Sequence, residues 1–215
     1  MTSSEIAVSA LCILAAYLIG GIPFGYLIGR MRGVDVRTVG SKNIGATNVF
    51  RTVGKKWGLL AFACDFLKGF VPTMCVRLFV DGPSWLPLAV GMTCVVGHML
   101  TPFMKFKGGK GVATAFGMLV ALVPALVGVA FLLFAVTFAL SHYISLGSCM
   151  AALFLGVAVW FEIPALGSPG WAGDKPLCVL MTLLSAFVVF KHRANIARLL
   201  RGQENKIFLF GKRNG

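Results

Sequence analysis

Long apolar runs separated by short polar, mostly basic segments dominate this chain. Three runs, residues 6–28, 57–80 and 85–104, have the length that crosses a bilayer as a helix, about 17–25 residues. Two shorter runs, residues 147–160 and 177–190, have the same composition. The pattern predicts an all-α, polytopic integral membrane protein.

Residues 112–140 form one further apolar run that is too long for a single upright span. Its 29 residues would give a helix of about 44 Å, against about 30 Å of hydrocarbon. Pro124 favours a break, and we expect two short spans, 112–124 and 125–141, which makes about seven in total. A five-span alternative keeps 112–140 as one span and leaves 141–175 outside.

Composition excludes several protein classes. Hydrophobic residues make up 58% of the chain and charged residues only 13%, where a soluble domain has about 25% charged residues. A soluble globule, a disordered chain and a disulfide scaffold are therefore excluded. The six cysteines all lie in apolar runs without a Cys-x-x-Cys pair, which predicts small buried hydrophobic residues. Without internal repeats or linkers, residues 1–215 are expected to form a single domain.

The distribution of charge predicts the orientation. The net charge is +13, and 17 of the 20 basic residues lie in segment 30–56, segment 105–111 and the tail from residue 191. All three fall on one side if the N-terminus is outside and the C-terminus cytoplasmic. Because basic residues flank the spans, we expect anionic headgroups and not nucleic acid as their partner. The opposite side receives the acidic residues and boundary tryptophans Glu5, Asp81, Glu162, Asp174, Trp85, Trp160 and Trp171.

The first polar stretch on the cytoplasmic side is residues 40–51. If it is helical, Asn43, Thr47 and Arg51 share one face, with Asn48 beside them. Ser41 would then cap the helix and leave free N–H groups near Lys42. Amides, hydroxyls and an arginine on one face suit a small phosphorylated polyol. A solvated basic loop is the alternative.

The second stretch, residues 106–114, opens the fourth span. Three glycines let the backbone wrap an anion, the helix start offers N–H groups, and Lys107 and Lys110 add charge. This is phosphate-site chemistry, but the Walker spacing is absent and nucleotide hydrolysis is not implied. A flexible turn with snorkelling lysines is the alternative.

The third stretch, residues 192–206, carries His192, Asn195 and Arg198 at helical spacing. They form a polar stripe opposite apolar positions. An amphipathic basic helix on the membrane surface is the alternative.

Single polar residues give weaker signals. Asp65 and Lys68 lie inside the second span at i, i+3 and are expected to pair, because unpaired charges are costly there. Whether that pair is structural or faces a substrate stays open. His98 and His142 lie toward the cytoplasmic side, and the turn at residues 145–148 offers hydroxyls to an anion or caps a helix.

Together these stretches resemble the bacterial membrane glycerol-3-phosphate acyltransferases that use acyl-phosphate, the PlsY family. Its three motifs correspond to residues 40–51, 97–114 and 192–206, in order and over nearly the whole chain. One departure follows His98: the family has Phe-Pro there, whereas the proline of this chain, Pro102, is displaced by one position.

The resemblance implies a function. It is transfer of a fatty acyl group from acyl-phosphate to the 1-hydroxyl of sn-glycerol-3-phosphate, giving lysophosphatidic acid and phosphate, the first step of phospholipid biosynthesis. It implies a multi-pass protein of the bacterial plasma (inner) membrane with its active site on the cytoplasmic face. The expected partners are the two substrates and the bilayer, without cofactor or metal ion. A transporter for an anionic metabolite or lipid is the alternative.

The resemblance also implies roles for individual residues. Direct attack by the glycerol hydroxyl is expected, with the proton going to His192 or to a substrate phosphate and no acyl-enzyme. The expected catalytic residues are His192, Asn195, Lys110 and Ser41. The expected substrate-binding residues are Asn43, Asn48, Arg51, Lys107, Gly108, Gly109, Gly111, Ser145, Ser148 and Glu204, with Lys206 beside them.

Overall fold

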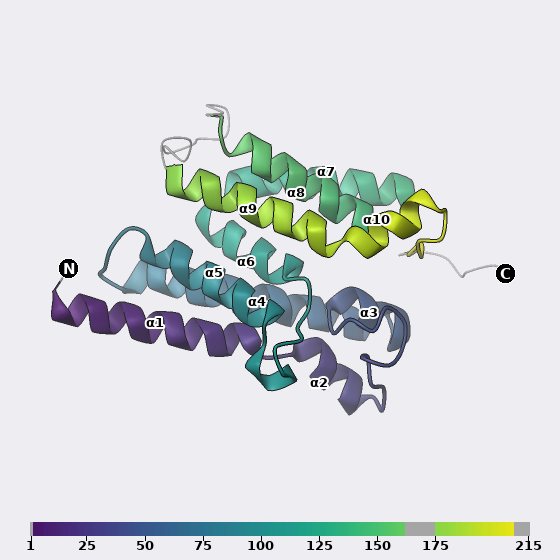
Figure 1. Cartoon of the computed structure of the whole chain (residues 1–215), viewed down its shortest axis with the longest axis horizontal. Helices are drawn as coiled ribbons and strands as arrows, with labels where there is room; N and C mark the ends of the chain where they lie inside the picture. Colours follow the sequence, from purple (N-terminus) through teal and green to yellow (C-terminus); the bar gives the residue numbers. More distant parts are fainter. Residues whose placement is uncertain (1, 162–174, 209–215) are drawn as a thin grey trace. The chain divides into compact units, whose positions relative to one another are not determined.

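The computed structural model describes residues 2–161 and 175–208, and every regular element there is helical (Figure 1). Glu162, Trp171, Asp174, Lys212 and Arg213, which entered the orientation argument, lie outside the described residues. The chain divides into two compact units, Met1–Val123 and Pro124–Gly215. The first holds α1 (Ser3–Gly21), α2 (Phe24–Met31), α3 (Ala46–Thr52), α4 (Lys55–Phe79), α5 (Leu86–Met99), the 3-10 turn η1 (Pro102–Met104) and α6 (Val112–Leu122); the second holds α7 (Pro124–Ser141), α8 (Ile144–Ala158), α9 (Lys175–Lys191) and α10 (Arg193–Leu200).

Glycines set the closest helix crossings in the first unit. A Cβ on Gly20 of α1 would lie 2.3 Å from the Cys94 carbonyl oxygen of α5. A Cβ on Gly69 of α4 would lie 2.0 Å from the Thr114 carbonyl oxygen of α6, and one on Gly117 would lie 2.1 Å from the Phe66 carbonyl oxygen. Small residues at these points let backbones touch, the usual way in which membrane helices associate.

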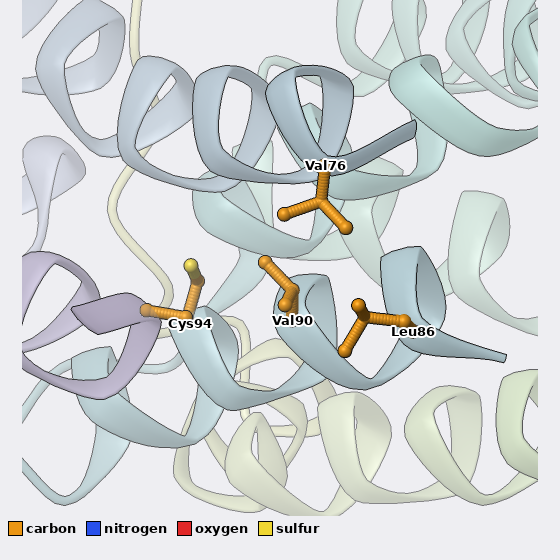
Figure 2. Close-up of a cluster of buried hydrophobic side chains, with 5 residues drawn as sticks. Val76, Leu86, Val90 and Cys94 are labelled. Atoms are coloured by element: carbon orange, nitrogen blue, oxygen red, sulfur yellow. The ribbon is translucent and has the colours of Figure 1, made fainter. Parts of the chain in front are cut away.

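An apolar cluster joins α1, α4 and α5. Ala16, Val76, Leu86, Val90 and Cys94 are all buried there. Figure 2 shows Val76 of α4 facing Val90 and Cys94 of α5. Cys149 and Cys178 are also buried as predicted, but Cys75 is exposed, because its position on α4 faces away from the packed helices.

Two interruptions matter for the predicted spans. The expected span 6–28 consists of α1 and α2, which are separated at Ile22 and Pro23. The break in the 112–140 run is confirmed: α6 ends at Leu122, Val123 is non-helical, and α7 begins at Pro124. The uninterrupted helix of the five-span alternative is therefore wrong, since proline cannot donate the backbone hydrogen bond that would continue α6.

Apolar helices occupy all the predicted positions. Four segments of the described chain are long and apolar enough to cross a bilayer, and α9 with α10, bent by 54°, is a fifth if the bent pair counts as one span. Helices α6 and α8 are shorter apolar helices at the positions of two predicted short spans. The total of seven spans and the orientation stay predictions. The four segments are Ser3–Met31, Lys55–Phe79, Leu86–Met104 and Pro124–Ser141.

The second unit packs α8 between α7 and α9. A Cβ on Gly147 would lie 2.8 Å from the Phe134 ring of α7, and one on Gly156 would lie 2.7 Å from Ser185 of α9. The Thr182 hydroxyl donates to the Gly156 carbonyl at 3.0 Å. These contacts pack α8, whose first turns carry Ser145 and Ser148, against α7 on one side and α9 on the other.

Candidate functional site

Asn48 organises the first motif. Its Oδ1 accepts the backbone N–H of Ser41 at 2.9 Å, and its Nδ2 donates to the carbonyls of Val36, at 2.8 Å, and Asn43, at 2.9 Å. The side chain is 2% exposed. Asn48 thus fixes the shape of the preceding loop and leaves Ser41 exposed on it.

The expected helix over residues 43–51 with a Ser41 cap is wrong in its first part. Helix α3 begins only at Ala46, with Gly45 as its N-cap. The Asn43 Oδ1 accepts the Gly45 N–H at 2.8 Å and holds Asn43 in a local turn. Asn43 therefore does not share a helical face with Arg51, which lies in the last turn of α3.

The first two motifs meet on one apolar cluster. Ile44 and Val49 of the first motif are buried with Ala61 of α4. Met104, three residues before Lys107, packs against the same cluster. The structure therefore anchors both predicted anion-binding segments of the first unit to the start of α4.

The second motif forms a tight glycine-rich loop, residues 107–111, between η1 and α6. The Gly108 N–H donates to the Met99 carbonyl and the Gly109 N–H to the His98 carbonyl, each at 3.1 Å. Gly111 has φ of +81° and precedes Val112, and no side chain caps the first turn of α6. A glycine with positive φ before an uncapped helix start presents backbone N–H groups to an anion. Lys107 is exposed and Lys110 half-buried on this loop.

Gly108→Ala tests the shape of this loop. A Cβ there would lie 2.0 Å from the His98 carbonyl oxygen and 2.7 Å from that of Met99, both rigid backbone. The loop must shift. If the loop receives a phosphate, as the sequence predicts, the KM of that phosphate substrate should rise about tenfold, or about 1.4 kcal/mol. Steady-state kinetics measure this. Gly128→Ala on α7, with nothing within 4 Å of the added Cβ, is the matched control.

In the second unit the third motif gathers around Glu204. Its Oε1 accepts from Asn195 Nδ2 at 2.8 Å and from Ser145 Oγ at 3.1 Å. Its Oε2 accepts from Arg198 Nε at 2.7 Å. Helix α10 therefore presents Asn195 and Arg198 on one stripe, as the spacing predicts, and Glu204 joins that stripe to the start of α8.

Ser148 and Lys206 lie close to this cluster in the chain. Ser148 is buried one turn after Ser145 on α8, so both hydroxyls belong to one helical face. The segment after α10 folds back, with the Ile207 N–H donating to the His142 carbonyl at 2.9 Å. Lys206 lies over the Tyr143 ring at 5.7 Å, directly before α8.

The Glu204 cluster has a defined pH dependence. Burial raises the pKa of the Glu204 carboxyl, but the hydrogen bonds from Asn195 and Arg198 outweigh this, so the pKa lies below its ordinary value of 4.5. Because this pKa is lower in the folded protein, the ionised carboxylate stabilises the fold at pH values above the unfolded-state pKa. This contribution is lost as the pH falls through the folded-state pKa.

Acid melting curves test this. We expect the melting temperature of wild type in detergent to be steady down to about pH 4.5 and to fall below it. In Glu204→Gln the melting temperature should be about 5 °C lower at neutral pH, and the acid decline should shrink. Asp35, whose pKa the Arg37 hydrogen bonds lower to about 2, is present in both proteins and cancels in the difference. Identical acid declines in the two proteins would contradict the assignment.

His192 lies at the bend between α9 and α10. Its Nδ1 is 2.8 Å from the Val188 carbonyl, and the residue is 4% exposed. A carbonyl only accepts, so Nδ1 carries the proton, and in the neutral imidazole Nε2 is the nitrogen that can accept another. The geometry is suitable for a general base.

Two charged features were underestimated from the sequence. The predicted Asp65–Lys68 pair is confirmed, at 2.8 Å, but the imidazole of His98 also lies 3.6 Å from the same carboxylate oxygen. The contact of His98 with Gly109 was not foreseen. The Thr101-Pro102 turn, which sends the chain back over α5, is the sequence signal that could have suggested it.

Among residues 2–161 and 175–208, no group of three or more His, Cys, Asp and Glu side chains could hold a metal ion.

Fold and site define the class of protein: a helical membrane protein with a glycine-rich loop before α6 in one unit and, in the other, buried His192, Asn195 and Glu204 beside a half-buried Arg198. The sequence model of the family described as glycerol-3-phosphate acyltransferase matches residues 10–202. The chain belongs to the glycerol-3-phosphate acyltransferase family.

Individual relatives agree over nearly full length. The glycerol-3-phosphate acyltransferase of Aquifex aeolicus is 41% identical over 200 residues, covering 90% of this chain and 96% of the relative. That of Geobacter sulfurreducens is 44% identical over 192 residues, covering 89% and 93%. That of Myxococcus xanthus is 44% identical over 196 residues, covering 90% and 97%.

Solved structures give the same result. A crystal structure of PlsY, an integral membrane glycerol 3-phosphate acyltransferase, in its glycerol 3-phosphate form is 39% identical with a TM-score of 0.81, covering 94% of this chain and 96% of that one. The lysophosphatidic acid form is 38% identical, with a TM-score of 0.78 and the same coverage. The predictions of a PlsY-family, all-helical integral membrane protein are confirmed, and the transporter alternative finds no support.

Proposed function

We propose that this protein transfers a fatty acyl group from acyl-phosphate to the 1-hydroxyl of sn-glycerol-3-phosphate. The observation that carries this proposal is the match to PlsY structures in glycerol 3-phosphate and lysophosphatidic acid forms, over 94% of the chain. Those forms name an acceptor and a product. The donor must then carry an activated acyl group, and an acyl-phosphate suits a site with several anion-binding elements.

The first unit supplies anion binding. The glycine-rich loop, with Lys107, Lys110 and the N–H groups at the start of α6, receives a phosphate. Gly108, Gly109 and Gly111 give that loop its shape. Ser41 and Arg51 contact the other phosphate or the transferred group, while Asn43 and Asn48 act by holding the Ser41 loop.

The second unit supplies proton transfer and orientation. His192 accepts the hydroxyl proton at Nε2, with Nδ1 fixed by the Val188 carbonyl. Asn195 orients the acceptor. Glu204 serves by holding Asn195 and Arg198, since both of its oxygens accept hydrogen bonds and a carboxylate repels a phosphate. Ser145 and Ser148 lie on one face of α8 and are assigned to binding.

The reaction balances without a cofactor. The glycerol 1-hydroxyl oxygen attacks the acyl carbonyl carbon and forms the ester C–O bond. The bond from that carbon to the phosphate oxygen breaks, and phosphate leaves with the electron pair. The hydroxyl proton goes to His192, or to a phosphate oxygen of a substrate. Phosphate is a good leaving group, so positioning and charge stabilisation supply most of the rate.

We place this single-domain enzyme in the bacterial plasma (inner) membrane, with the active site on the cytoplasmic face. The family match from residue 10 to 202 runs through both units, which supports one domain with one activity. The basic segments that flank the apolar helices support the orientation, because basic loops stay cytoplasmic.

Donor choice tests the proposal. Purified protein in detergent receives labelled glycerol-3-phosphate with palmitoyl-phosphate or, separately, with palmitoyl-CoA, and lysophosphatidic acid is followed. We expect product from palmitoyl-phosphate alone. Product from the CoA ester alone would keep an acyltransferase but overturn the donor.

A further inference from the structure

A buried charged cluster lies directly beneath the glycine-rich loop. Asp65 and Lys68, both on α4, are 2% and 4% exposed, and their oxygen and nitrogen are 2.8 Å apart. A buried ion pair adds little stability over apolar residues of the same size, because desolvation offsets the attraction. Two charges kept inside an apolar helix therefore require another explanation.

Lys68 joins this pair to the end of α1. Its Nζ donates to the Ile22 carbonyl at 2.8 Å, at the point where α1 stops before Pro23. The Thr101 hydroxyl, just beyond α5, donates to the neighbouring Gly21 carbonyl at 2.6 Å. The end of α1, the middle of α4 and the end of α5 are thus fixed to one another by side-chain bonds.

The Asp65 carboxylate also contacts His98. The His98 Nδ1 lies 3.6 Å from the Asp65 oxygen that pairs with Lys68, and the His98 side chain is buried. At this distance the contact is electrostatic and not a hydrogen bond, and a carboxylate beside Nδ1 favours the tautomer with the proton on that nitrogen.

The other edge of the His98 ring faces the glycine-rich loop. A Cβ on Gly109 would lie 2.1 Å from Nε2 and 2.9 Å from Cε1 of that ring. The His98 carbonyl also accepts the Gly109 N–H at 3.1 Å. His98 therefore contacts the loop with both its ring and its backbone.

We propose that Asp65, Lys68 and His98 form a buried positioning unit that fixes the glycine-rich loop in the shape that receives a substrate phosphate. The inference rests on the proposed function, which assigns phosphate binding to that loop. None of the three residues is a catalytic residue: they act through the backbone of residues 108–111.

The first test removes the charges without leaving one unpaired. Asp65→Asn/Lys68→Met preserves volume, and Leu67→Met, between them on the exposed face of α4, is the matched control. We expect a melting temperature close to wild type and hydrogen exchange about tenfold faster at the Gly108 and Gly109 amides only. The KM of the phosphate substrate bound there should rise about tenfold, with kcat changed less than about threefold.

The second test measures the energetic coupling between the His98 ring and the glycine-rich loop. Gly109→Ala alone should raise that KM, because the new methyl meets the ring. In the His98→Ala background the same methyl should cost at least about fivefold less, since residues in contact are not additive. Additive effects of the two substitutions would overturn the contact.

The other possible results of these experiments also decide the proposal. Wild-type exchange and KM in the folded double variant would overturn the proposal. Equal losses in melting temperature, kcat and exchange throughout α4 and α5 would make the cluster a packing element only, which also overturns it. If wild type forms no lysophosphatidic acid, the proposed function fails, while the exchange experiment, which needs no substrate, still decides the role of the cluster.

Discussion

Lys110→Met is expected to lower kcat/KM about 1,000-fold. Lys110 lies on the glycine-rich loop just before the uncapped start of α6. The proposed function assigns its ammonium and the N–H groups there to the charge that develops on the leaving phosphate, and losing one such donor typically costs about 10²–10³ in rate. Methionine keeps the length of the side chain and removes only the charge.

The matched control is Lys105→Met, two residues before the loop begins. Lys105 is exposed and is assigned no role in binding. Its variant should keep activity within about threefold, since an isolated surface charge contributes little. Initial rates with palmitoyl-phosphate at saturating and limiting glycerol-3-phosphate measure both variants. Equal losses in the two would mean that general basicity, and not Lys110, matters.

His192→Ala is expected to lower kcat about 100-fold, the lower end of what a general base supplies. The Val188 carbonyl holds the proton on Nδ1, so the lone pair of the neutral imidazole is on Nε2. Initial rates of purified wild type and variant at saturating substrate give kcat.

His192→Gln separates base from hydrogen-bonding partner. Glutamine can hold a hydroxyl but cannot take its proton, so kcat should remain close to that of the alanine variant. If either variant turns over within about threefold of wild type, a phosphate oxygen of a substrate is the base instead. A trapped acyl-enzyme in any variant would exclude direct transfer.

Local signals predicted much of the fold. Hydrophobic run lengths located the apolar helices, and Pro124 located the break between α6 and α7. The cost of charge in an apolar helix predicted the Asp65–Lys68 pair. Helical spacing predicted that Asn195 and Arg198 share one face of α10. Each of these follows from neighbours within one helix, which is why sequence alone was sufficient.

Side-chain competition with the backbone was not predictable in the same way. Helical spacing placed Asn43 on a face with Arg51, but the Asn43 side chain takes the Gly45 N–H and delays the helix to Ala46. Asn48 was predicted to bind substrate. Its side chain hydrogen-bonds to the backbone of Ser41, Val36 and Asn43, and the local sequence does not indicate these partners.

Contacts between residues that are far apart in the sequence could not be predicted either. Glu204 meets Ser145 across 59 positions, and His98 meets Gly109 only because the chain turns back at Pro102. Charge and spacing indicate which residues need partners. They do not identify the partner when it comes from another helix, and the tertiary fold was needed for that.

Product stoichiometry tests the central claim most directly. Purified protein is given palmitoyl-phosphate and glycerol-3-phosphate, and lysophosphatidic acid and inorganic phosphate are quantified in the same samples. Acyl transfer predicts equal amounts of both products, and neither above background when glycerol-3-phosphate is left out. Phosphate release without lysophosphatidic acid would indicate a hydrolase, and folded wild-type protein that forms neither product would contradict the account.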